Sequence, residues 1–253
     1  MFVDTHCHLD DERFSLDTSK KDLGLDRVDF AITMGCDLRG SENCKILSEK
    51  YDNLYFGAGF HPGNIENYST QDFEKLKTLY LHPKCVCVGE IGLDYHWEPF
   101  DKEKQQEILI EQIKTSNLVK LPVSIHSRDA TKDMLDILKS HFPKEGGVMH
   151  CYSGSKETAK ILLDMGCYIS FAGTLTFKNA SNLKEVASYV PKDMVLTETD
   201  SPYLAPHPLR GTKNNPSNVG IITDFLANIN GISIEEMAKI VKDNAKRLFK
   251  KII

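Results

Sequence analysis

The sequence predicts an α/β protein with a single (β/α)8 TIM barrel that occupies residues 1–253. Its length is typical of one complete barrel, and apolar runs without strict alternation indicate strands that are buried on both faces. Segments with helical periodicity separate these runs, so strand and helix alternate along the whole chain. The expected strands are Met1–Asp4, Asp29–Met34, Leu54–Gly59, Val86–Ile91, Pro122–Ile125, Gly147–Met149, Tyr168–Phe171 and Met194–Thr197.

Helical periodicity predicts the elements that cover the barrel. Eight strand–helix units in about 250 residues favour a closed barrel over an open doubly wound sheet. A Gly-rich dinucleotide motif does not follow the first strand, which weakens the open-sheet alternative, and we find no linker that divides the chain into domains. The expected helices are Ser41–Tyr51, Thr70–Leu81, Lys102–Leu118, Ala130–His141, Lys156–Met165, Ala180–Tyr189, Val219–Asn230 and Ile234–Leu248.

The composition is that of an ordinary globular protein. Hydrophobic residues make up 41% of the chain and charged residues 26%. The N-terminus lacks the basic segment and apolar run of a signal peptide, and no window approaches the roughly 18 apolar residues of a membrane span, so we expect a cytoplasmic protein. The net charge of −5 gives no global attraction to nucleic acid, so polyanion binding would need a local cluster of cations.

Seven cysteines form an odd set without a Cys-x-x-Cys pair. Most of them belong to apolar, strand-like runs, which indicates small buried side chains in a reducing compartment. The functional alternative is a zinc site that uses Cys85 and Cys87. No second Cys or His pair follows at the spacing of a zinc finger. We therefore favour the buried, structural role.

Two histidines and four later residues form the strongest chemical pattern. His6 and His8 are two positions apart, so on a strand their side chains point to the same face. Taken alone the pair is weak, because two histidines at a strand end can simply be polar surface residues. Four further residues follow apolar runs, and we expect each to lie where a strand ends: Glu90, His126, His150 and Asp200.

The carboxyl ends of barrel strands converge on one face, where the active sites of this fold lie. If these residues merely capped exposed loops, a mixture dominated by Lys, Ser and Asn would be expected. Imidazoles and carboxylates instead form a set of nitrogen and oxygen ligands that suits Zn²⁺, Mn²⁺, Fe²⁺ or Co²⁺, and Mg²⁺ less readily. The sequence therefore predicts a metal site at the carboxyl ends of the strands.

Several motifs resemble those of the TatD family of metal-dependent deoxyribonucleases in the amidohydrolase superfamily. The resemblance implies a TIM barrel with a binuclear site that hydrolyses DNA phosphodiester bonds, in several members as a 3′-to-5′ exonuclease that prefers single strands. It covers essentially the whole chain. The matching segments are Asp4–Asp10, Gly59–Pro62, Gly89–Tyr95, Ile125–Ala130, His150–Gly154, Glu198–Leu204 and Asn244–Phe249.

The same resemblance implies roles for the six residues. His6, His8 and Asp200 would hold one ion, and His126 and His150 would hold the other, with Glu90 as the bridge. Asp200 would also act as general base toward the attacking water. Many amidohydrolases of small amides bridge their ions with a modified lysine, so Glu90 favours nuclease chemistry. The family suggests Mg²⁺, whereas the ligand chemistry favours Zn²⁺ or Mn²⁺.

Other residues are candidates for contact with the substrate. His61 matches an extra active-site histidine of the family, able to contact a phosphate oxygen, and its alternative is a loop cap. Arg128, Lys178 and Arg210 follow strands and are expected to bind phosphate, although each could equally be a solvated surface cation.

An aromatic cluster follows Glu90. Its members, Tyr95, His96, Trp97 and Phe100, would either stack on bases or form a hydrophobic lid over the barrel.

Two other functions stay open at this stage. The same barrel and metals would also hydrolyse an amide, lactone or aminoacyl ester, since this fold hosts many reactions. A non-catalytic barrel that binds nucleic acid or protein is the alternative from another class, and the complete ligand set argues against it. We expect single-stranded DNA as the substrate, no membrane contact, no obligate protein partner and a monomer.

Overall fold

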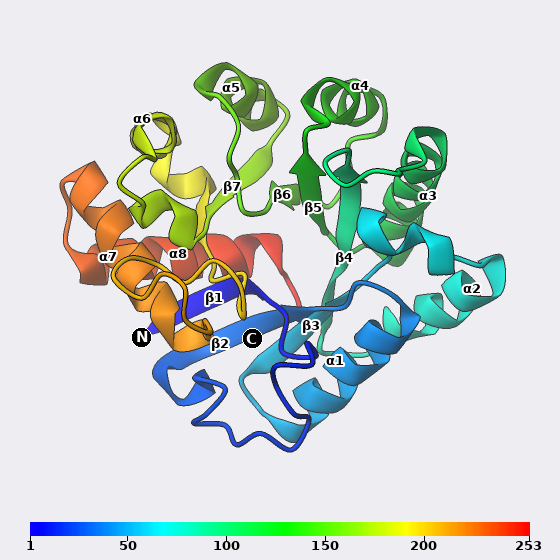
Figure 1. Ribbon diagram of the computed structural model, residues 1–253, viewed down its shortest axis with the longest axis horizontal. Coiled ribbons are helices and arrows are strands. Elements are labelled where there is room, and N and C mark those ends of the chain that lie inside the picture. Colours follow the sequence, from blue (N-terminus) through cyan, green and yellow to red (C-terminus); the bar gives the residue numbers. More distant parts are fainter.

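The computed structural model describes residues 1–253, the side chain of Asn67 excepted. Eight parallel strands form one sheet in the order β1 to β8, and the helices surround it, which is a (β/α)8 TIM barrel (Figure 1). The fold class predicted from the sequence is therefore confirmed. The strands are β1 (Phe2–Cys7), β2 (Val28–Met34), β3 (Leu54–Ala58), β4 (Cys85–Asp94), β5 (Val123–Arg128), β6 (Gly147–Met149), β7 (Cys167–Phe171) and β8 (Val195–Thr197).

Helices α1 to α6 connect the strands from β2 to β8, β1 and β2 are joined through a loop with a 3₁₀ turn, and the helices cover the outside of the sheet (Figure 1). Each presents an apolar face to the strands, as amphipathic helices of globular proteins do. None of the described helices is both long enough and apolar enough to cross a membrane. The helices are α1 (Leu38–Lys50), α2 (Thr70–Leu79), α3 (Lys102–Val119), α4 (Thr131–His141), α5 (Lys156–Asp164), α6 (Ser181–Tyr189), α7 (Val219–Asn230) and α8 (Ile234–Leu248), with 3₁₀ turns η1 (Leu25–Arg27), η2 (Pro62–Asn67), η3 (Gly173–Thr176), η4 (Lys192–Met194) and η5 (Pro216–Asn218).

Three strands run further than the sequence predicts. β1 continues to Cys7, β4 to Asp94 and β5 to Arg128. The expected strands ended at Asp4, Ile91 and Ile125, but the backbone ladder continues beyond each of these residues. Glu90 and His126 therefore lie within their strands, not at the ends where we expected them.

The barrel is closed between its first and last strands by hydrogen bonds around the functional residues. The amide of Asp200 donates to the carbonyl of His6 (2.9 Å), and the amide of His8 donates to the carbonyl of Ser201 (2.6 Å). Deeper in the barrel, Thr5 Oγ1 donates to the carbonyl of Thr197 (3.0 Å). These hydrogen bonds place His6 of β1 and His8, which directly follows β1, beside the loop that follows β8.

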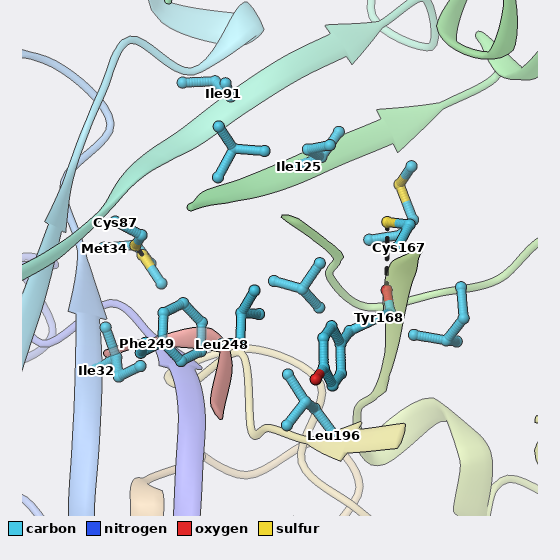
Figure 2. Packing of buried hydrophobic residues seen from close by; sticks show 14 of the residues in the cluster. Ile32, Met34, Cys87, Ile91, Ile125, Cys167, Tyr168, Leu196, Leu248 and Phe249 are labelled. Atoms are coloured by element: carbon cyan, nitrogen blue, oxygen red, sulfur yellow. Dashed lines mark hydrogen bonds between the residues drawn. The ribbon is translucent and has the colours of Figure 1, made fainter. Parts of the chain in front are cut away.

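Helix α8 closes the opposite end of the barrel. Leu248 and Phe249 are buried at its carboxyl end, among side chains such as Ile32 of β2 and Leu196 of β8 (Figure 2). Lys251, three residues after α8, donates to the carbonyl of Tyr80 ahead of β4, which places this segment at the amino ends of the strands. Burial of one such large apolar side chain contributes about 1.5–3 kcal/mol, so α8 stabilises the barrel from the end remote from the site.

Candidate metal centre

A cavity of about 750 Å³ opens at the carboxyl ends of the strands. Most of the predicted site residues line it, and His6 lies directly beneath with 1% of its surface exposed. The residues brought together from separate strands and loops are His8, His61, Glu90, His126, Arg128, His150 and Asp200.

Glu90 lies between two pairs of imidazoles. Its Oε2 atom is 3.3 Å from Nε2 of His6 and 3.4 Å from Nε2 of His8. Its Oε1 atom is 3.0 Å from Nδ1 of His126 and 2.8 Å from Nε2 of His150. The two carboxylate oxygens therefore face two different nitrogen pairs, which is the arrangement of a bridging ligand.

Asp200 completes the first of these groups. Its Oδ1 atom lies 3.4 Å from Nε2 of His8 and 3.8 Å from Nε2 of His6, and those two nitrogens are 3.2 Å apart. Lone pairs from two imidazoles and a carboxylate converge on one point, as a divalent cation requires. Asp200 has a left-handed backbone (φ 53°), which turns the chain sharply after β8 and directs the side chain into the cavity.

The remote ring nitrogens of His8 and His150 face hydrogen-bond acceptors. Nδ1 of His8 lies 3.0 Å from the carbonyl oxygen of Met34. Nδ1 of His150 lies 3.2 Å from Oε1 of Glu198. An acceptor at Nδ1 holds the ring proton there, so Nε2 presents its lone pair toward Glu90.

His126 and His6 follow the same rule. Nε2 of His126 lies 3.1 Å from Oδ2 of Asp94, so its Nδ1 presents the lone pair toward Glu90. Nδ1 of His6 lies 3.2 Å from the hydroxyl of Ser124, which can accept the ring proton. Metal-binding histidines almost always donate their second N–H to such a partner, and this tautomer pattern fits a divalent cation at each nitrogen pair.

In His61 the ring nitrogen that faces Glu90 carries the proton, in contrast to the four candidate ligands. The amide of Gly63 donates to its Nδ1 (3.0 Å), so in the neutral ring the proton is on Nε2. That Nε2 atom lies 3.4 Å from Oε1 of Glu90. Burial lowers the pKa of His61 to about 4, which keeps the ring neutral near pH 7. His61 is therefore a hydrogen-bond donor into the cavity, distinct from the four candidate ligands.

The two acidic candidates are held in the ionised form. Burial opposes the charge on Glu90, but the surrounding imidazoles, His150 first, outweigh it and hold its pKa well below the ordinary value. Burial likewise opposes the charge on Asp200, and the hydrogen bond with His8 outweighs it and lowers the pKa. Two ionised carboxylates surrounded by correctly oriented imidazoles are chemically suited to divalent cations.

Sequence reasoning missed the residues that orient the candidate ligands. Glu198 accepts from the amide of Cys151 (2.7 Å) as well as facing His150, and it is fully buried. Asp4 accepts from the amide of Thr199 (2.8 Å) and so fixes the turn that carries Asp200. A signal for Glu198 was present, because a carboxylate directly after an apolar run and two positions before a candidate ligand lies at the same end of the barrel as that ligand.

Two cysteines depart from the buried role expected for the set. Cys36 and Cys151 line the cavity, and Sγ of Cys36 lies 3.7 Å from Nδ1 of His8. Cys85 and Cys87 are buried in β4 as expected, and the described groups that could hold a metal do not include them. The structure thus offers no support for the alternative zinc site.

Only one of the three expected phosphate-binding cations reaches the cavity. Arg128 lines it at the end of β5. Lys178 and Arg210 are exposed and lie outside its described lining, and the guanidinium of Arg210 packs on the ring of Phe177 at 4.5 Å. Proximity to a strand end placed them on the correct side of the barrel, but the loop conformation directs their side chains elsewhere.

The four residues of the aromatic cluster after β4 have different surroundings in the structure. Tyr95 and Phe100 stack on each other with centroids 5.0 Å apart, and Nδ1 of His96 lies 2.7 Å from Asp129. Trp97 lines the cavity with 69% of its surface exposed. Of the four residues, only Trp97 thus presents an aromatic surface to that cavity.

Comparison with known proteins agrees with this geometry. Residues 3–250 match the family model described as TatD related DNase. The chain is 40% identical over 253 residues to the uncharacterized metal-dependent hydrolase YabD of Bacillus subtilis, covering 99% of both chains. It is 41% identical to the uncharacterized metal-dependent hydrolase YcfH of Escherichia coli, covering 98% of this chain and 95% of that one.

Solved structures give the same result. The crystal structure of YJJV, a TatD homologue from Escherichia coli, superposes with a TM-score of 0.92 at 32% identity and covers 98% of both chains. A mutant organophosphorus hydrolase from Deinococcus radiodurans superposes with a TM-score of 0.65 at 13% identity, covering 98% of this chain and 92% of that one, which shows a shared fold alone. The chain belongs to the TatD family and is a metal-dependent hydrolase.

Proposed function

We propose that this hydrolase cleaves the phosphodiester bonds of DNA, as a 3′-to-5′ exonuclease that prefers single strands. The observation that carries the proposal is the position of Glu90, whose two oxygens face separate imidazole pairs. Two cations on either side of a carboxylate, about 3.5–4 Å apart, suit in-line displacement at phosphorus. The family description, TatD related DNase, supports the same substrate class.

The candidate ligands fall into two groups in this proposal. His6, His8 and Asp200 would hold one divalent cation, and His126 and His150 would hold the other, with Glu90 available to both. When bound, the cations would activate a water molecule and neutralise charge on the phosphate. Zn²⁺ or Mn²⁺ suits the imidazole-rich set, and Mg²⁺ is the ion that the family resemblance suggests.

The remaining chemistry belongs to the protein's own side chains. Asp200 lines the cavity and faces His8 through one oxygen, so its carboxylate takes the proton of the attacking water as general base. His61 directs its Nε2–H into the cavity and donates to a phosphate oxygen. Arg128 adds charge-assisted hydrogen bonds to the same group. Lys178 and Arg210 lie outside the described cavity lining, so they would contact only a part of the DNA that is distant from the cleaved bond.

Digestion of 3′-labelled and 5′-labelled oligonucleotides tests the proposal. Single-stranded and duplex substrates are incubated with the purified protein in Mg²⁺, Mn²⁺, Zn²⁺ and Co²⁺ separately. We expect the 3′ label to be released as mononucleotide first, with faster cleavage of single strands. Esters, lactones and amides are assayed in parallel, because efficient turnover of one of these without DNA cleavage would contradict the proposal.

A matched pair of variants links the activity to the site. Asp200→Ala removes both the candidate ligand and the candidate base, and we expect a loss of at least about 1,000-fold in kcat, as when a general base and a ligand are lost together. Asp224→Ala changes an exposed aspartate on α7 and serves as the control. Equal DNA cleavage by both variants would place the nuclease activity elsewhere.

A further inference from the structure

Two exposed aromatic rings flank the candidate metal centre. Trp97 follows β4 and is 69% exposed, whereas Tyr203 follows β8 and is 45% exposed. Both residues line the same cavity. In the strand order, β4 and β8 are four positions apart in a ring of eight, so these loops face each other across the barrel (Figure 1). The candidate ligands lie between them.

The guanidinium group of an arginine packs against each ring. The central carbon of Arg13 lies 4.1 Å from the centroid of Tyr203, and that of Arg128 lies 5.4 Å from the centroid of Trp97. Asp11 fixes the first pair, because it accepts from Tyr203 Oη at 2.8 Å and from two guanidinium nitrogens of Arg13 at 2.8 Å. The Tyr203 ring is thus held rigidly, which lowers the entropy cost of using it as a contact surface.

The charge of the cavity shows what kind of attraction these rings can provide. Arg128 is the one Lys or Arg among the described lining residues, against five carboxylates. A polyanion thus meets little positive charge from the protein itself. Stacking on exposed rings is a source of binding energy that does not depend on that charge, because every base has a π-face.

We propose that Trp97 and Tyr203 each stack on an unpaired base, one on either side of the phosphate that is hydrolysed. This inference rests on the proposed nuclease function and assigns its substrate class as nucleic acid with unstacked bases at the cleavage point. In a duplex, pairing and stacking hold the bases away from the rings, so the clamp formed by Trp97 and Tyr203 accounts for a preference for single strands. The arrangement discriminates little between the four bases.

Intrinsic fluorescence provides a direct test, since Trp97 is the single tryptophan of the chain. The metal-loaded protein is titrated with a short single-stranded oligonucleotide that carries phosphorothioate linkages to slow cleavage. Anisotropy of a dye at the far end of the oligonucleotide records binding independently. We expect tryptophan emission to fall in parallel with the rise in anisotropy, and binding without a change in emission would overturn the role of Trp97.

Kinetics of substitutions test both rings. Trp97→Ala and Tyr203→Ala should each raise KM for single-stranded DNA by about 5- to 100-fold, with kcat changed little, because a stacked base contributes to ground-state binding. Trp97→Phe should restore most of the affinity. Tyr189→Ala is the matched control, because Tyr189 is 37% exposed with Lys156 Nζ 5.3 Å from its ring, outside the described cavity lining.

Abasic substrates separate failure of the clamp from failure of the nuclease. Removal of the two bases that flank the terminal phosphodiester should weaken wild-type binding as much as the double substitution Trp97→Ala/Tyr203→Ala does, and should have no further effect on that double variant. If intact DNA is cleaved with the same KM by all these proteins and from abasic ends, the clamp is wrong and the nuclease stands. If no nucleic acid is bound or cleaved, both proposals are wrong.

Discussion

Oε1 of Glu198 lies 3.2 Å from Nδ1 of His150, and the opposite nitrogen of the same ring lies 2.8 Å from Glu90. Glu198 therefore fixes the tautomer in which His150 can bind a cation. We expect Glu198→Gln to weaken metal affinity by about 10- to 100-fold, the usual effect of losing such a partner. Competition titration against a chromogenic chelator measures the affinity. Glu185→Gln, an exposed change on α6, is the control, and equal affinities would contradict the positioning role.

Removal of metal should lower the thermal stability of the protein. A ligand present at 100 times its dissociation constant stabilises the native state by about 2.7 kcal/mol, which corresponds to roughly 5–10 °C in Tm for a chain of this size. Thermal melts with EDTA and with added Zn²⁺ or Mn²⁺ measure the shift. His8→Ala should show a reduced response, since it removes one candidate ligand, and an identical response in both proteins would show that the ion binds elsewhere.

Gly92 is required where β4 and β5 carry Glu90 and His126. Its backbone has φ 156°, and a β-carbon there would lie 2.0 Å from the carbonyl oxygen of His126. Gly92→Ala must separate the strands, and we expect a loss of about 2–4 kcal/mol in the free energy of unfolding together with weaker metal binding. Urea denaturation gives the value. Gly166→Ala also has positive φ but meets nothing within 4 Å, so it should cost only about 1 kcal/mol.

Asp11 should give the Tyr203 loop a pH-dependent stability. The hydrogen bond from Arg13 lowers the pKa of Asp11, so the unfolded chain binds this proton more readily than the folded one. Its contribution is therefore present above the ordinary pKa of 3.8 and is lost as the pH falls through the lowered folded value. Because Arg13 is 42% exposed, we expect no more than about 1 kcal/mol.

Denaturation of Asp11→Asn and the wild type between pH 2 and pH 7 measures this effect. The difference in the free energy of unfolding should be largest near neutral pH and should shrink in acid. Asp17 is exposed and lies, like Asp11, in the loop that follows β1, so Asp17→Asn serves as the control. A difference that grows as the pH falls would reverse the assigned sign.

The sequence predicts the barrel and the candidate ligands because apolar runs and ligand identities are both local features. The ends of the strands are harder to predict from the sequence, since β4 continues to Asp94 beyond the expected end at Ile91. The partner of His8 is the carbonyl of Met34, a backbone atom that every residue has, so the sequence contains no signal for it. Arg210 and Lys178 show a third limit, because the direction of a loop side chain depends on packing such as the Arg210–Phe177 contact.

The hydrogen bond from Asp200 to His6 also bears on how the protein is made. His6 lies in the first strand and Asp200 follows the last one, so the first candidate metal group cannot assemble until nearly the whole barrel has left the ribosome. A nascent chain that holds only the early strands presents His6 and His8 without their carboxylate partner from β8. Assembly of this first group is therefore a late event of biosynthesis, whereas Glu90, His126 and His150 come from β4, β5 and the end of β6 and are made earlier.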